Sequence, residues 1–394
     1  MVRKRRWHGR IPAALAALVA AVAGCEPQVR WDWWQPPPPS HDVGKARIDA
    51  RTALRQAADA PNAVTRAHAI EGLAQIAGAR AGGVYLQALE DPNPTARFAA
   101  GMAVGDARYA PAEEKLLRMA EDKQAEPDRR VFCAVLYALH RLGNDSYTPA
   151  LGELLFDPEA EVRASAALAM GKLGEPSAVG PLKAMLSDEQ EEMVKLQTRE
   201  SLAVLGDARS QHLLEAFTKS YFLDLRLASI SALLRTGAPR AQVVLKQMLA
   251  RDKSPRAKVA AAGALAKLGH IDDDAYALCL RAAESPRQVL REAFGPGREI
   301  ADIEAASLQQ LAALALGRMR RQEAVGVLHP LLQSPEGSVR VAASISVLKL
   351  TGGMYEPEPP PPPPPPAVEP QATTAPAMEL PPVRPKLHIS GPKD

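Results

Sequence analysis

Apolar residues recur at helical spacing along most of the chain, and the same pattern returns many times. In one clear block, Val162, Ala166 and Met170 lie at i, i+4 and i+8, which places them on one face of a helix. Gly174 follows them and is typical of the residue that ends a helix. A second apolar stripe runs through residues 179–186. The block therefore predicts two short amphipathic helices with a break at the glycine.

A basic residue near the start of the first helix marks each copy of this block. Most steps between copies are 31–33 residues, and one step is 51. Around nine two-helix units fit between residues 44 and 352. One amphipathic pair cannot bury its apolar face alone, so each pair must stack on its neighbours, which predicts an all-α fold, an α-solenoid of about nine repeats. The marker positions are Arg66, Arg97, Arg130, Arg163, Lys195, Arg226, Lys258, Gln309 (in place of a cation) and Arg340.

This pattern resembles the HEAT repeat, in the short form found in phycobilin lyase subunits and their many non-lyase relatives. The block Asp157–Gly174 carries the resemblance most clearly, with an Asp-Pro loop, an apolar helix and a terminal glycine. The resemblance implies a superhelical stack of helix pairs. It does not specify an activity, because superhelical repeats serve many unrelated tasks.

An acidic residue precedes several of the marker cations by six positions. One acid and one base in each repeat predict a ladder of charge-assisted hydrogen bonds between neighbouring repeats. The alternative is that the periodic cations form an anion-binding stripe, and the regular acid spacing favours the structural ladder. The predicted ladder residues are Asp91 with Arg97, Asp157 with Arg163, and Asp252 with Lys258.

Residues 1–24 have the order of an export signal. A basic segment, Arg3–Arg10, precedes about 13 apolar residues, Ile11–Ala23. Such a helix would span roughly 20 Å, less than the ~30 Å hydrocarbon core, which favours a signal peptide over a membrane-spanning helix. Val22–Cys25 resembles the lipobox of bacterial lipoprotein precursors, which implies cleavage before Cys25 and its lipid modification. The alternative is a secreted protein with a chance cysteine.

Residues 25–43 would then form a lipid anchor and a tether in the bacterial cell envelope, facing the periplasm. The lipoprotein resemblance implies that the residue after the anchor helps to sort between membranes, and Glu26 favours the outer membrane. Trp31, Trp33 and Trp34 follow the anchor closely. They either rest at the membrane interface or cap the apolar end of the first repeat, and the sequence leaves both open.

The long step of the repeat places an insertion at about residues 285–304. Insertions in solenoids emerge as loops on one face, often the binding face. This insertion contains Arg287, Arg291, Phe294 and Arg298. An exposed aromatic residue among arginines is typical of a partner contact, so we predict a partner site here. A merely long loop is the alternative.

Residues 353–394 form a Pro-rich tail that includes eight consecutive prolines, Pro359–Pro366. Such a run predicts a stiff polyproline II segment in a disordered tail. The tail is interpreted as a spacer. The alternative is that residues 381–386 are a short ligand for another protein.

The charges and side chains give no sign of nucleic-acid binding or of an active site. The formal charge is +3, and removal of residues 1–24, with five bases and no acid, leaves −2. No two histidines are spaced for joint metal binding, and the His-Glu dipeptides that hold iron in the HEAT-like deoxyhypusine hydroxylase do not occur. Residues 270–274, one histidine and three aspartates, either bind a divalent cation or cap the next helix. We expect no catalytic, metal or cofactor residues.

The predicted solenoid and the predicted location in the cell envelope together favour a binding role. We predict a membrane-anchored scaffold or adaptor that holds a protein or peptide partner in the cell envelope and is not an enzyme. Two alternatives stay open, an enzyme or accessory subunit of the phycobilin-lyase type and a passive structural spacer.

Overall fold

The computed structural model describes residues 42–122, 126–237 and 240–353. All regular structure in these ranges is helical, which confirms the all-α prediction. None of the described helices is long and apolar enough to cross a membrane. Several interpreted features lie outside these ranges and stay predictions: the signal peptide, the anchor Cys25, the tether with Trp31, Trp33 and Trp34, and the Pro-rich tail.

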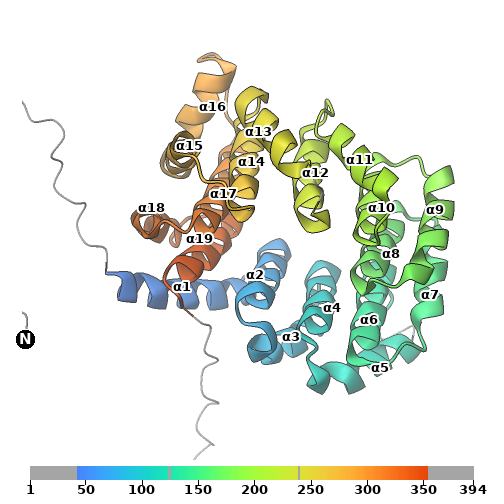
Figure 1. Ribbon diagram of the computed structural model, residues 1–394. Helices are drawn as coiled ribbons and strands as arrows, with labels where there is room; N and C mark the ends of the chain where they lie inside the picture. The colour runs from blue at the N-terminus through green and yellow to red at the C-terminus, as the bar shows by residue number, and fades with distance from the viewer. Residues whose placement is uncertain (1–41, 123–125, 238–239, 354–394) are drawn as a thin grey trace, which may run out of the picture. The chain divides into compact units, whose positions relative to one another are not determined.

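Inner and outer helices alternate along the chain (Figure 1). The inner helices are α2 (Ala63–Ile76), α4 (Pro94–Ala107), α6 (Arg129–Leu142), α8 (Ala160–Leu173), α10 (Glu192–Val204), α12 (Leu223–Thr236), α14 (Pro255–Lys267), α17 (Asp302–Met319) and α19 (Gly337–Leu350). The outer helices are α1 (Val43–Ala58), α3 (Gly82–Ala88), α5 (Glu113–Glu121), α7 (Thr148–Glu153), α9 (Val179–Asp188), α11 (Ala208–Phe217), α13 (Ala241–Arg251), α15 (Asp273–Glu284) and α18 (Val325–Leu331). Each outer helix packs against the inner helix that follows it, which gives nine pairs in the described chain.

The turn after an inner helix commonly uses a residue in the left-handed region. Gly174 ends α8 with φ of 79°, a conformation that glycine adopts without steric cost. Arg108 and Arg320 take the same place after α4 and α17, with φ of 49° and 56°. Short 3-10 helices lie at Gly78–Ala81, Ala110–Ala112, Leu154–Phe156, Pro176–Ala178 and Gln322–Ala324.

Small residues let neighbouring inner helices approach closely. Gly101 of α4 faces Ala134 of α6, and a Cβ placed at Gly101 would lie 2.9 Å from the Ala134 Cβ. Gly263 of α14 meets Ala315 of α17 with the same spacing of 2.9 Å. Protein interiors are close-packed, so no larger side chain fits at these points without moving a helix. The inner helices therefore form a tight wall.

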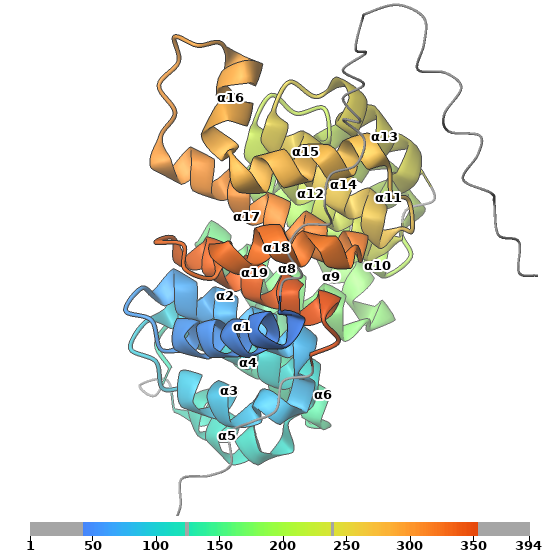
Figure 2. The same cartoon turned by 90° about the vertical axis from the view of Figure 1, so that its left-hand side faces the viewer.

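The first and last repeats pack on each other, so the wall closes on itself. Helix α19 lies against both α1 and α2 (Figures 1 and 2). Gly72 of α2 faces Ile345 of α19, and a Cβ at Gly72 would lie 2.5 Å from Ile345 Cδ1. Two polar contacts join the same ends: His329 Nε2 with Asp49 Oδ2 at 2.8 Å, and Lys349 Nζ donating to Gln75 Oε1 at 3.1 Å.

Closure bears on the two interpretations of the tryptophan-rich tether. The apolar face of α1, with Ala46, Ala50 and Leu54, is buried. Because α19 covers this end of the stack, the first repeat does not need the tryptophans as a cap. The tryptophans themselves lie outside the described residues, so both interpretations of the tether stay predictions.

The insertion differs from the expected loop. It contains a helix, α16 (Pro286–Phe294), which packs against α15 and α17. Val289 and Leu290 are buried, and Pro286 occupies the first turn, where its missing N–H costs nothing. The loop prediction was wrong because these two apolar residues give the segment a face to bury. Within the insertion, residue 285 and residues 295–301 are irregular.

The substitution Gly72→Leu should lower the free energy of unfolding by about 1–3 kcal/mol, because the new side chain overpacks against Ile345 where α2 meets α19. Urea denaturation of the full chain followed by circular dichroism measures this change. The matched control is Gly180→Leu on α9, where a Cβ meets nothing within 4 Å. The control should be stabilised, since leucine is the better helix former. Equal effects of the two substitutions would contradict a closed junction.

Candidate functional site

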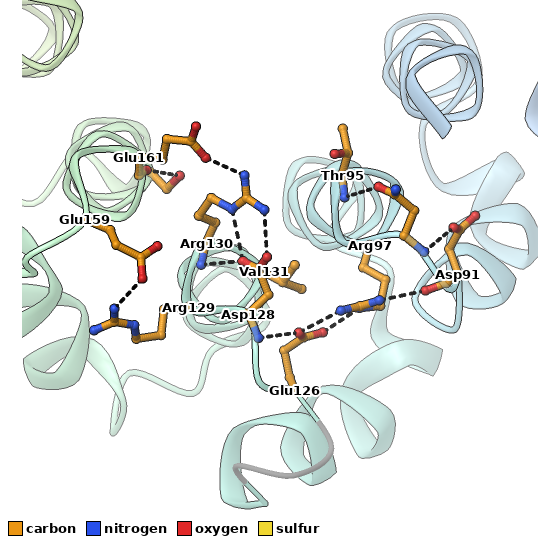
Figure 3. Close-up of polar contacts among 12 residues, drawn as sticks. Asp91, Thr95, Arg97, Glu126, Asp128, Arg129, Arg130, Val131, Glu159 and Glu161 are labelled. Carbon is orange, nitrogen blue, oxygen red and sulfur yellow. Dashed lines mark hydrogen bonds and ion pairs between the residues drawn. The ribbon is translucent and has the colours of Figure 1, made fainter. Parts of the chain in front are cut away.

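The marker arginines lie where consecutive repeats meet, and Arg97 shows the arrangement (Figure 3). Arg97 donates to both carboxylate oxygens of Glu126 in the next repeat, at 2.7 and 3.0 Å. It also donates to the backbone carbonyl of Asp91 in its own repeat, at 2.8 Å. Glu126 in turn accepts the backbone N–H of Asp128 at 3.0 Å. One guanidinium therefore ties two consecutive loops together.

The same arrangement recurs along the stack and corrects the expected pairing. Four of the marker arginines pair with an acid of the following repeat, while the residue six positions before each of them accepts through its backbone carbonyl. The pairs are Arg66–Asp91 at 2.6 Å, Arg97–Glu126 at 2.7 Å, Arg163–Glu189 at 2.7 Å and Arg226–Asp252 at 3.0 Å.

Two of the predicted ladder residues take other places. The carboxylate of Asp157 pairs with Arg129, not with Arg130 or Arg163. Lys258 makes no ion pair with any residue that the structure describes. An ammonium lacks the planar fork that reaches a carboxylate and a carbonyl together, so lysine does not reproduce the arginine arrangement. The four paired arginines therefore hold consecutive repeats together, and their guanidinium groups are already bound to carboxylates.

A second periodic position lies nine residues after each marker, which is half a turn away on the helix. Five inner helices carry a cation there: Lys172, Arg235, Lys267, Arg318 and Lys349. Sequence reasoning missed this set, although the repeat spacing contains the signal. These side chains lie near the C-terminal ends of their helices, where the helix dipole favours a positive charge.

A cavity of about 630 Å³ opens on the inner wall among α2, α4, α8, α10 and α12. Charged residues from different helices pair with one another at its lining. Lys172 Nζ lies 2.7 Å from Asp106 Oδ2, and Arg235 Nη2 donates to Glu200 Oε2 at 2.7 Å. Burial raises the pKa of Glu71, against the opposing effect of the charges of His68 and Lys172. The apolar part of the lining is Ala74, Phe98, Ala99, Met102, Ala103, Leu168 and Val204.

The described residues do not form a metal site or an activated thiol. No group of three or more His, Cys, Asp or Glu residues within the described ranges is placed to hold a metal ion. Cys133 and Cys279 are free and buried, and burial raises the pKa of each to about 12. In the loop 270–274, Asp272 caps α15 by accepting the N–H groups of Asp274 and Ala275, at 2.8 and 3.1 Å.

The insertion brings together two of its four candidate contact residues. The guanidinium carbon of Arg298 lies 4.2 Å from the centroid of the Phe294 ring. Arg298 also pairs with Glu304 at 3.1 Å. Arg287 donates to the carbonyl of Ile300 at 2.8 Å and pairs with Asp302, so it holds the loop after α16. Arg291 and the edge of Phe294 remain exposed.

Comparison with known proteins gives one family match. A family model described as HEAT repeats matches residues 51–136, 123–203 and 210–295, more than half of the chain. No protein of curated function matches the sequence.

Two solved structures are similar to this chain at low sequence identity. The complex of CpcE and CpcF of phycocyanin lyase from Nostoc sp. PCC7120 is 20% identical, covers 68% of this chain and 94% of its own, and has a TM-score of 0.33. Human deoxyhypusine hydroxylase in complex with glycerol is 19% identical, covers 70% and 97%, and has a TM-score of 0.35. These values give no ground for transferring an activity.

Replacement of Arg163 by methionine should lower the free energy of unfolding by about 3 kcal/mol at neutral pH. Glu189, whose side chain is 2% exposed, would lose its cation. Urea denaturation of both proteins measures the difference. The control is Arg118→Met, which breaks the exposed pair with Glu114 and should leave stability nearly unchanged.

At low pH, the wild type and Arg163→Met should no longer differ in their free energy of unfolding. Arg163 holds the pKa of Glu189 below its ordinary value, so the pair stabilises the fold above about pH 4.5. This stabilisation is lost progressively as the pH falls below that value. The stabilities of the wild type and of Arg163→Met should therefore converge in acid, and a gap independent of pH would contradict the assigned role.

Proposed function

Because the chain belongs to the HEAT-repeat family, whose stacked helix pairs offer extended binding surfaces, we propose that it is a lipid-anchored scaffold that holds a protein partner in the bacterial cell envelope. The solenoid supplies the binding surface, and the N-terminal sequence supplies the address. The two parts of the proposal rest on separate observations and are tested separately.

The exposed end of α16 is the observation that carries partner binding. Phe294 is 37% exposed, and Arg298 stacks on its ring while Arg291 stays free of described ion pairs. An aromatic ring beside guanidinium groups is the composition that protein interfaces favour. Arg287 and Arg298 are held by Asp302 and Glu304, so the partner meets a preorganised surface.

The segment before the solenoid supports the envelope address. The order of basic residues, a short apolar run and the lipobox-like Val22–Cys25 matches a lipoprotein precursor. Glu26 favours the outer membrane. With Trp31, Trp33 and Trp34 at the membrane interface, the tether would hold the solenoid close to the lipid surface.

The full-length protein, expressed in a bacterium that processes lipoproteins and fed alkyne-tagged palmitate, should carry the label and fractionate with membranes. Cys25→Ser should lose the label, because the thiol that accepts the lipid is gone. Cys133→Ala removes a buried thiol and should keep the label, which makes it the control. A labelled Cys25→Ser protein or an unlabelled wild type would refute the anchor.

Affinity capture from detergent-solubilised envelopes should retain a specific envelope protein on the wild type. The double variant Arg291→Glu, Phe294→Ala should lose it, because the exposed part of the α16 surface is removed while the loop-holding Arg287 stays. The control is Lys219→Glu, Tyr221→Ala, which changes an equally basic and aromatic site where Tyr221 is 92% exposed.

The outcomes separate the possible roles. A partner lost only from the α16 variant supports the scaffold and its contact surface. A partner that both variants retain would move the contact away from α16. Failure to capture any partner on the wild type would replace the scaffold with a passive spacer.

A further inference from the structure

The cations of the inner wall fall into two groups that differ in their partners. On one side, Lys172 pairs with Asp106 and the guanidinium of Arg235 pairs with Glu200. On the other side, Lys267, Arg318 and Lys349 occupy the same repeat position on α14, α17 and α19. No carboxylate of the described residues pairs with any of these three, which we call the basic sector.

The three positive charges of the basic sector lie close to one another. Helix α17 packs against both α14 and α19. The pKa of Lys349 is lowered by burial and by the charges of Arg318 and Lys267, while burial lowers the pKa of Arg318. Arg318 Nη1 lies over α14, since a Cβ placed at Gly263 would be 3.6 Å from it.

Within the described ranges, only neutral or partial charges face this sector. Lys349 Nζ donates to the neutral side chain of Gln75 at 3.1 Å. The helix C-termini favour a cation by about 0.3–1 kcal/mol each, but they do so on all inner helices, including those whose cations also have carboxylates. An anionic ligand would relieve the repulsion and fill the guanidinium's donor sites.

We propose that the basic sector binds an acidic segment of the partner protein, with carboxylates facing Lys267, Arg318 and Lys349. This inference rests on the proposed function, because it assumes a protein partner. The wall beside the sector carries Glu71 and Glu200, with apolar side chains between them. A peptide can place apolar residues against that part and acids against the cations, whereas a uniform polyanion such as a nucleic acid has no apolar side chains to match this lining.

Fluorescence anisotropy of a fluorescein-labelled peptide tests the assignment on the full-length protein. The peptide combines glutamates with leucines, and a second peptide has every glutamate replaced by glutamine. The acidic peptide should bind and the glutamine peptide should not. The triple variant Lys267→Gln, Arg318→Gln, Lys349→Gln should weaken binding at least about tenfold, through loss of several charge-assisted hydrogen bonds.

A matched triple variant on the outer layer controls for net charge. Lys246→Gln, Arg251→Gln, Lys253→Gln removes the same charge from exposed positions on and after α13, and it should bind like the wild type. The single variant Lys349→Gln, which removes one charge at the C-terminal end of α19, should give a partial loss and keeps the test decisive if the inner triple does not fold.

Several results would overturn the assignment. These are equal binding by the wild type and the inner triple, equal loss in both triples, or no binding of the acidic peptide to the wild type. Tighter binding of a single-stranded oligonucleotide than of the acidic peptide would also overturn it. If the envelope partner is still captured in such a case, the scaffold function stands and only the basic sector fails.

Discussion

Close packing between inner helices is the constraint on which the rest of this structure depends. At Gly101, Gly171, Gly263 and Gly317, a side-chain carbon would meet the next inner helix at under 3 Å. Each repeat is therefore fixed against the next with little freedom. The rotation of each repeat relative to the previous one has the same direction, so these rotations add along the chain. At Gly72 the last helix meets the first, and the wall closes. A closed stack has no exposed apolar end, which removes the usual need of a solenoid for capping repeats.

In the closed stack, the marker cations and the cations nine residues after them have different surroundings and different partners. Four of the marker arginines lie toward the loops and hold neighbouring repeats together through ion pairs. Their partners include buried acids such as Glu189. The cations nine residues later lie half a turn away and toward the inner wall. There, Lys172 pairs with Asp106 of α4. The three cations of the basic sector have no such partner among the residues that the structure describes. The same repeat length thus yields a structural ladder on one side and a charged lining on the other.

The insertion lies where the ladder is interrupted. Lys258 and Gln309 replace the marker arginine in the two inner helices that flank α16. Gln309 donates to the carbonyl of Ala283 at 2.7 Å, which keeps one of the ladder's backbone contacts without a charge. Glu304 is held by Arg298 of the insertion and by Arg256, at 3.1 and 3.6 Å. Contacts of the insertion thereby replace the ladder between these repeats, so the insertion is an integral part of the stack.

The sequence by itself determined the helical class, the two-helix repeat and the position of the insertion, because helical periodicity and glycine breaks are local properties. It also predicted that acids and bases would link repeats. Only the tertiary structure decided which acid each arginine reaches, since Arg97 finds Glu126 of the next repeat through stacking and not through sequence distance. Closure of the wall was likewise beyond the sequence, because it is the sum of small rotations at nine interfaces. Only the structure shows that Lys267, Arg318 and Lys349 have no carboxylate partner among the described residues, because the partner of a charge depends on what folding brings beside it.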